Sequence, residues 1–348
     1  MELNWSLKEI YPSFESEEFK NDLDKLDQSI KSLNTWADEV VCEEGNVRPK
    51  LEEYIKRSSK LSELIGRLEA FVSLTLSADT KNSEGLRYSD ILDSKLTEIV
   101  EATTKLERWI SNIKDIDTVI KGSEILKEHE FYIKEIIEKS KYLLSDREES
   151  IISKMKNTGS NAWLKLKDNL ISNLKVDIEI DGEMKELPLT VVLNMAYDPN
   201  GELRRKAYFA EIESYKKVEE GVAAALNGIK GEVLTVCDLR GYKSPLDMTL
   251  VNSRMDEESL DAMLEAMKES MPLFRKYLRR KGDLLGYKNG LPFYEMYAPV
   301  SEAEMKFTYE EAAKYVEKNF RTFSDHLADF AKTAVEKSWI RSEEHTSE

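Results

Sequence analysis

Apolar side chains recur at every third or fourth position through most of this chain, and that spacing restricts it to a fold built mainly from helices. The segment after Ser16 is representative, with one apolar stripe formed by Phe19, Leu23, Leu26, Ile30 and Leu33. Helix-breaking residues are few, because the 348 residues include only 14 glycines and 8 prolines. Charged residues make up 34% of the chain, enough to cover the outer faces of long helices. We therefore expect a mainly α fold.

Capping residues predict where several helices begin. Ser145-Asp-Arg-Glu148 and Thr308-Tyr-Glu-Glu311 are capping boxes, since the hydroxyl can accept from the third amide while the glutamate reaches back. Asp256 is a candidate N-cap for a helix over 260–285. The helix that follows Thr308 is expected to run to about Lys318. Two further stretches, over 86–113 and 203–236, also carry the helical pattern.

One segment follows a period of two instead of 3.6. Val176, Ile178 and Ile180 alternate with acidic residues, and Asp181-Gly182 then provides a tight turn. This pattern predicts a small β hairpin over 174–190. A second short strand is expected within the aromatic stretch from Pro292 to Pro299.

Charge and cysteine content exclude several classes of protein. The net charge of −16 argues against binding to nucleic acid, which needs a basic face. Cys42 and Cys237 are too far apart in sequence for a disulfide framework, and we interpret them as isolated buried thiols in a reducing compartment. The start of the chain lacks the basic segment followed by an apolar segment that marks a signal peptide. The sequence also contains no run of 18 uncharged apolar residues, the length that a membrane-spanning helix needs. We expect a cytoplasmic protein with no membrane partner.

The chain offers little that could perform catalysis. His129-Glu130-Phe131-Tyr132-Ile133 begins like the zinc motif His-Glu-x-x-His but has Ile133 at the second ligand position, so His129 is interpreted as an exposed residue at a helix start. His326 is expected on the surface, and His345 lies in the last eight residues. Gly228-Ile-Lys-Gly231 lies inside a helical pattern and lacks the strand that a phosphate-binding loop requires. We therefore expect no catalytic, cofactor-binding or metal-ligating residue in this chain.

Four methionines near the middle of the chain fall partly at helical spacing. Met255, Met263, Met267 and Met271 could fill an irregular core, because the thioether side chain is flexible and apolar. We expect them to be buried.

A series of short strings, each weak alone, resembles in its order the oligoendopeptidase F group of the M3 zinc metallopeptidases. The resemblance covers residues 1–340. Its strings are Trp5–Phe14, Leu144–Glu149, Gly159–Trp163 with Leu166 and Leu170, the hairpin at 174–190, Asp198–Ala207, Ala224–Ile229, Asp238–Ser244, Lys281–Gly286 and Tyr294–Pro299. Glu295 is a small departure, since aspartate is more usual in that string.

This resemblance implies a mostly helical fold in which two halves enclose a substrate channel, and hydrolysis of short peptides by one zinc ion. The family holds zinc with His-Glu-x-x-His on one helix and a glutamate on a later helix. Both lie beyond this chain in the family order, so no ligand is carried over to a residue here. The resemblance also implies an N-terminal helical domain over 1–195 and the first part of the catalytic domain over 196–340.

We expect the C-terminal end of this sequence to differ from that of the natural protein. The last helix begins near Ser324 and keeps its pattern to Trp339 without a Gly or Asn stop signal, so we expect it to be cut there. Residues 341–348 match the in-frame translation of a common sequencing adapter and are interpreted as an artefact, the alternative being an ordinary charged tail. This predicts an inactive N-terminal fragment, truncated before the zinc-binding helix. The alternative is a non-catalytic helical peptide-binding or scaffold protein. The sequence leaves the oligomeric state undetermined.

Overall fold

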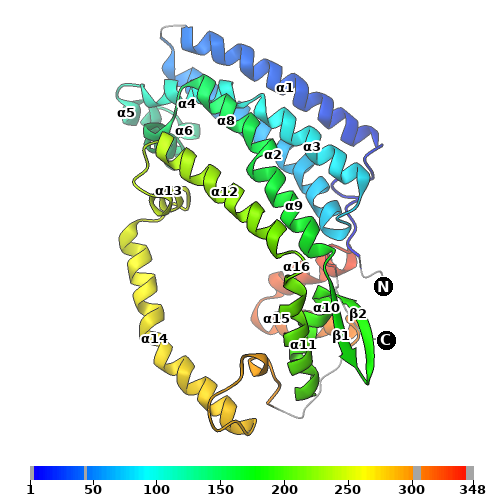
Figure 1. Ribbon diagram of the computed structural model, residues 1–348. Helices are drawn as coiled ribbons and strands as arrows, with labels where there is room; N and C mark the ends of the chain where they lie inside the picture. Colours follow the sequence, from blue (N-terminus) through cyan, green and yellow to red (C-terminus); the bar gives the residue numbers. More distant parts are fainter. Residues whose placement is uncertain (1–3, 43–44, 301–306, 342–348) are drawn as a thin grey trace. The chain divides into compact units, whose positions relative to one another are not determined.

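The computed structural model describes residues 4–42, 45–300 and 307–341 (Figure 1). The chain forms two compact units that are each discontinuous in sequence. The first, called here the helical unit, comprises residues 7–164 and 227–253. The second, the hairpin unit, comprises residues 1–6, 165–226 and 254–348. The fold is mainly α with one small antiparallel hairpin, as the periodicity predicts.

The helical unit contains most of the N-terminal helices. They are α1 (Glu17–Cys42), α2 (Val47–Ala78), α3 (Ser83–Thr97), α4 (Val100–Ser111), α5 (Ile116–Lys121), α6 (Glu124–Glu128), α7 (Glu130–Lys139), η1 (Ser140–Tyr142), α8 (Asp146–Thr158) and α13 (Pro245–Asn252). Two helices, α9 (Ser160–Ser172) and α12 (Glu219–Leu239), belong partly to each unit.

An aromatic cluster anchors the first three helices of the helical unit. Tyr11 and Phe14 precede α1, Phe19 lies on α1, Phe71 on α2 and Tyr88 on α3. Their ring centroids lie between 4.9 and 5.7 Å apart, mostly edge to face, which is the favoured geometry for aromatic pairs. The turn-rich start of the chain is therefore held by its aromatic residues.

The hairpin unit is built around a two-stranded sheet. Strands β1 (Lys175–Ile180) and β2 (Glu183–Pro188) pair antiparallel, with Val176 opposite Leu187. Asp181 and Gly182 both have positive φ, of 54° and 83°, as a type I′ turn requires. The apolar side of β1 packs on α11, where Val176 and Ile178 share a core with Ala207. The hairpin prediction is confirmed.

The other elements of this unit are α10 (Leu189–Asn194), η2 (Met195–Tyr197), α11 (Gly201–Tyr215), α14 (Glu257–Leu284), η3 (Phe293–Glu295), α15 (Tyr309–Phe323) and α16 (Asp325–Glu336).

The helix starts follow their capping residues. Both capping boxes are formed, with Ser145 accepting from the amide of Glu148 and Thr308 from that of Glu311. Asp256 accepts from the amide of Ser259 at the start of α14. The ends of helices agree less well with the prediction: α15 continues five residues past Lys318, to Phe323. The stretches 86–113 and 203–236 are each divided into two helices, with breaks at 98–99 and 216–218.

Two local predictions are wrong. The stretch from Pro292 to Pro299 forms a short 3-10 helix, not a strand, because the Glu295 amide donates to the Pro292 carbonyl at 3.0 Å and the Glu295 side chain turns inward. The last helix ends at Glu336, before Trp339. Ser338 takes the left-handed conformation there, with φ of 55°. The Trp339 amide then donates to the Ala334 carbonyl at 2.8 Å, and the Ser338 amide to Val335 at 3.1 Å, which completes a Schellman motif without glycine.

Part of the sequence interpretation lies outside the described residues. Residues 342–348, most of the segment interpreted as adapter translation, are among these, and so is His345. Within the described ranges, no helix combines the length and the apolar character that crossing a membrane needs.

Candidate functional site

Of the histidines that the sequence analysis considered, His129 belongs to the helical unit and His326 to the hairpin unit. His129 joins α6 to α7, and its Nδ1 lies 2.9 Å from the Ile125 carbonyl oxygen. It is half-buried, so the prediction of an exposed residue is only partly right. Ile133 is fully buried in the core of the helical unit, which makes the fifth position of the zinc-like string a packing position. His326 is exposed on α16, as predicted. Gly228–Gly231 lies within α12, also as predicted.

Buried charges gather instead where the family-like strings meet. In the hairpin unit, Arg204 of α11 donates from Nη2 to the Glu295 carboxylate at 2.5 Å, and both side chains are buried. Tyr287 donates its hydroxyl to the other oxygen of Glu295 at 3.1 Å. Lys281, at the end of α14, donates to the Met296 carbonyl at 2.6 Å. Three strings that are distant in sequence, around 198–207, 281–286 and 294–299, therefore form one polar cluster.

The environment of this cluster disfavours additional charge. Burial, followed by the nearby Arg204 guanidinium, lowers the pKa of Lys281. Burial and the hydrogen bond to Glu295 raise the pKa of Tyr287. Among the residues that the structure describes, none offers a hydrogen-bond partner to the Arg204 Nε atom. The geometry is that of a buried ion pair that joins three elements, in which each charge compensates the other.

A second cluster joins two strings of the helical unit. Arg240 donates to Glu149 Oε2 at 2.6 Å, and the Leu144 amide donates to Glu149 Oε1 at 3.0 Å. Tyr142 stacks on Tyr242 with ring centroids 3.8 Å apart. The residues around 144–149 and 238–244 are thus held together by one charged and one aromatic contact.

Glu107 lies beside this second cluster. Burial and the Glu149 carboxylate raise its pKa to about 7, although Lys139 and Arg240 act in the opposite direction. A carboxyl group with a pKa near neutrality is a candidate for proton transfer when it lines an open cleft. Here the two carboxyl groups lie among structural partners of the helical unit, so we interpret the shift as a consequence of packing.

A third pair of strings meets through a glycine. Ser160 donates from its hydroxyl to Glu232 at 2.7 Å, and its amide donates to the same carboxylate at 2.7 Å. The Trp163 indole lies against Gly228 so closely that a Cβ atom there would approach Nε1 to 2.5 Å. Only glycine allows this contact between α9 and α12.

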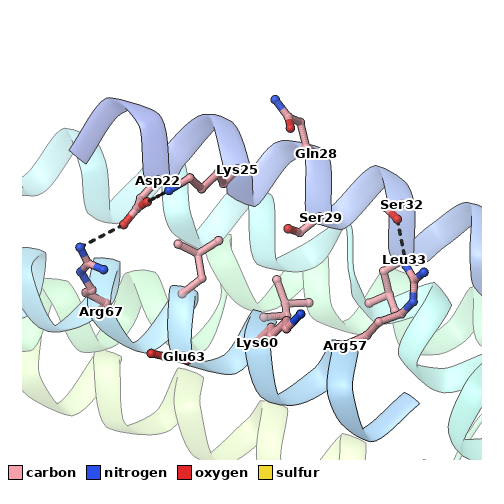
Figure 2. A pocket seen from close by; sticks show the side chains of 12 residues that line it. Asp22, Lys25, Gln28, Ser29, Ser32, Leu33, Arg57, Lys60, Glu63 and Arg67 are labelled. Carbon is pink, nitrogen blue, oxygen red and sulfur yellow. Dashed lines mark hydrogen bonds and ion pairs between the residues drawn. The ribbon is translucent and has the colours of Figure 1, made fainter. Parts of the chain in front are cut away.

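The helical unit also has a surface groove of about 530 Å³ between α1 and α2. Figure 2 shows Asp22 of α1 between Lys25 and Arg67, with nitrogen–oxygen distances of 2.8 and 3.5 Å. Although burial raises the pKa of Asp22, hydrogen bonds from Lys25 and Tyr11 outweigh it, and the net pKa lies below its usual value. At the other end, Arg57 donates to Ser32 at 3.0 Å. Asp22, Arg57 and Arg67 therefore connect the two helices.

Two burial predictions are wrong. Cys42 is exposed at the last position of α1, whereas Cys237 is buried as expected, and both thiols are free. Met255, Met263, Met267 and Met271 are exposed by 37 to 56%. Helical spacing marks one face of a helix but does not say which segment covers that face. Among the described residues, no three His, Cys, Asp or Glu side chains are placed to hold a metal ion.

Comparisons with known proteins match most of the chain. A family model described as Oligopeptidase F matches residues 111–175, and a model described as Peptidase family M3 matches residues 194–324. The chain is 25% identical over 342 residues to Oligopeptidase PepF of Bacillus subtilis, covering 97% of this chain and 50% of that protein. It is 23% identical to an Oligoendopeptidase F homolog of Lactococcus lactis, covering 99% of this chain and 57% of that protein. The chain thus spans about half the length of the curated relatives it matches.

A solved structure has the same fold. Oligoendopeptidase-F from Enterococcus faecium superposes with a TM-score of 0.70 at 19% identity, covering 93% of this chain and 66% of the other. At that identity the likeness concerns the fold alone. The roles assigned to the clusters above are therefore argued only from contacts within this chain.

Proposed function

This chain belongs to the oligoendopeptidase F group of the M3 peptidases, and from that premise we propose that its protein is a zinc endopeptidase that hydrolyses short peptides. The observation that carries the proposal is that two models of this family match the chain in succession, at 111–175 and 194–324. The relatives that align to nearly the whole chain are peptidases of the same group. A zinc ion bound in such an enzyme polarises the scissile carbonyl and activates water.

The described residues do not fit a zinc site, because no set of three suitable ligands converges among them. We therefore assign no catalytic step to these side chains. We propose that the zinc ligands belong to a part of the protein outside these 348 residues. The extra length of the relatives supports this, since their matched portions are only 50 and 57% of their chains.

We further propose that residues 1–195 form an N-terminal domain and residues 196–340 the first part of the peptidase domain. The two family matches support this division, because one ends at residue 175 and the other begins at residue 194. The proposed role of both parts is to shape the substrate channel. The proposed location is the cytoplasm, for which the free thiols Cys42 and Cys237 are typical.

Peptide hydrolysis tests the proposal. Purified residues 1–340 and a longer form of the same protein would each be incubated with internally quenched peptides of five to fifteen residues, with added zinc or with a chelator. We expect turnover only by the longer form, lost with the chelator and restored by zinc. Chelator-sensitive cleavage by residues 1–340 would place zinc ligands within this chain. Absence of turnover by a longer form that binds the same peptides would favour the non-catalytic peptide-binding alternative.

A further inference from the structure

Asparagine is followed directly by glycine at three places in this chain: Asn200-Gly201, Asn227-Gly228 and Asn289-Gly290. Asparagine is a thermolabile residue. The backbone nitrogen of the next residue can attack its side-chain carboxamide, and glycine hinders this attack least because it has no Cβ atom. All three asparagines are exposed, so exposure does not distinguish them. Their backbone geometry and their hydrogen bonds do.

Asn200 is held as the N-cap of α11. Its side-chain oxygen accepts hydrogen bonds from the amides of Glu202 and Leu203, at 3.0 and 3.4 Å. A Cβ atom at Gly201 would lie 3.1 Å from Nη2 of the buried Arg204, so the glycine is closely packed as well. The cap would have to break before the Gly201 nitrogen could reach the carboxamide carbon.

Asn227 is held by its helix. It lies in the interior of α12, and so does Gly228. The attack requires a rotation about ψ of the asparagine, and inside a helix this rotation breaks the hydrogen bonds of the surrounding turns. The Trp163 indole packs against Gly228 and holds this turn further in place.

Asn289 has neither restraint. It lies in the loop between α14 and η3 (Figure 1). Among the described residues, none makes a hydrogen bond to its carboxamide or to the Gly290 amide. Gly290 has φ of 105°, and no described atom beyond its chain neighbours would lie within 4 Å of a Cβ atom there. The attacking nitrogen and the carboxamide can therefore approach each other without breaking a contact.

The two ends of this loop are held, in contrast to its tip. The Tyr287 amide donates to the Gly282 carbonyl at 2.8 Å, and the Tyr287 hydroxyl donates to Glu295 at 3.1 Å. A Cβ atom at Gly282 would lie 3.7 Å from the Leu291 nitrogen, so Leu291 also lies against the end of α14. Residues 288–290 thus form an exposed tip between two fixed ends.

We propose that Asn289 is a site of spontaneous deamidation, that the fold protects Asn200 and Asn227, and that the isoaspartate product loosens the fixed ends of the loop. The Gly290 nitrogen loses its proton and forms a bond to Cγ of Asn289, while the Cγ–Nδ2 bond breaks and Nδ2 leaves as ammonia with that proton. Water then opens the cyclic imide. Cleavage of the new bond to Cγ gives aspartate, and cleavage of the bond to the backbone carbonyl gives isoaspartate, whose backbone is longer by one methylene group.

Peptide mapping by mass spectrometry tests the site. The 348-residue chain would be incubated at pH 6 and pH 8, and the peptides that contain the three pairs would be compared over time. We expect Asn289 to react about tenfold faster than Asn200 or Asn227, and faster at pH 8, because the attacking nitrogen must lose its proton. In guanidinium chloride the three rates should become similar, since glycine follows each asparagine. Equal rates in the folded chain, or faster conversion at Asn200 or Asn227, would overturn the proposal.

Two variants separate the chemistry from its structural effect. Asn289→Gln keeps the carboxamide but needs a larger ring, so conversion at this position should stop, and continued conversion would contradict the cyclic route. Asn289→Asp carries the same new charge without the extra methylene group. The Tyr287 amide should therefore exchange its hydrogen faster in the isoaspartate form than in freshly prepared Asn289→Asp. Equal exchange in the two forms would show that the longer backbone does not loosen the ends, against the proposal.

Discussion

At the scale of single residues, the charged side chains that the sequence left unexplained are structural partners. Arg204 and Glu295 are 91 positions apart, yet they form a buried pair, and Arg240 with Glu149 repeats the arrangement in the other unit. Glu295, the one departure noted in the family-like strings, reaches both Arg204 and Tyr287. Strings that are distant in the sequence thus pair with one another in space.

The raised pKa of Glu107 predicts a pH-dependent stability. Its pKa of about 7 lies above the ordinary value near 4.5, so the folded state holds the proton over that interval and stability falls as the pH rises through it. Glu107→Gln removes the charge and should raise the free energy of unfolding above pH 7 by about 3 kcal/mol, with little change below pH 4.5. Urea unfolding at pH 4.5, 6 and 8 measures this.

Glu149→Gln is the matched control for Glu107, because the Glu149 carboxylate accepts hydrogen bonds from Arg240 and from the Leu144 amide. That substitution should lower stability at pH 8. If Glu107→Gln also lowered stability there, its carboxyl group would have a stabilising partner and the assignment of its pKa shift to burial would be wrong.

At the scale of elements, the first residue of a helix is easier to predict than its last residue. A start depends on one side chain that meets an amide three residues away, as at Ser145 and Thr308, and such a contact is local. An end depends on which residue accepts the left-handed conformation. Serine did so at 338, although glycine or asparagine is the usual signal. The break at 216–218 likewise carries no glycine or proline.

The Schellman motif at the end of α16 predicts a stabilising substitution. Ser338 has φ of 55°, a conformation that costs a residue with a Cβ atom about 1 kcal/mol and costs glycine almost nothing. Ser338→Gly should therefore protect the amides of Ser338 and Trp339 more strongly against hydrogen exchange, with Ser338→Ala as the control that keeps the cost. Equal protection in the two variants would show that Ser338 is not held in this conformation in solution.

At the scale of the whole molecule, the chain forms two units, each with its own apolar core. The core of the helical unit is the larger, with aromatic and aliphatic residues from α1 to α7, whereas that of the hairpin unit comes mainly from β1, α10 and α11. The buried pair Arg204–Glu295 therefore contributes to a unit that has few apolar contacts to replace it.

This difference predicts a local effect of breaking that pair. Arg204→Met leaves the Glu295 carboxylate buried without its partner, which should destabilise the hairpin unit by about 3–5 kcal/mol. Hydrogen exchange should accelerate in β1 and α11 while the amides of α1 and α2 stay protected. The double variant Arg204→Met/Glu295→Leu should recover most of the protection. Uniform acceleration throughout the chain would show that the two units unfold together.

The sequence by itself determined the helical class, the β hairpin and the start of each capped helix, because these depend on residues within one or two turns of each other. It also indicated the family, since the strings keep their order along the chain. Only the tertiary structure decided that these strings meet as buried ion pairs, that Glu295 turns inward from a 3-10 helix, and that Met263, Met267 and Met271 are exposed among the described residues. Those outcomes depend on contacts between distant segments, and periodicity shows which face of a helix is apolar without showing what that face meets.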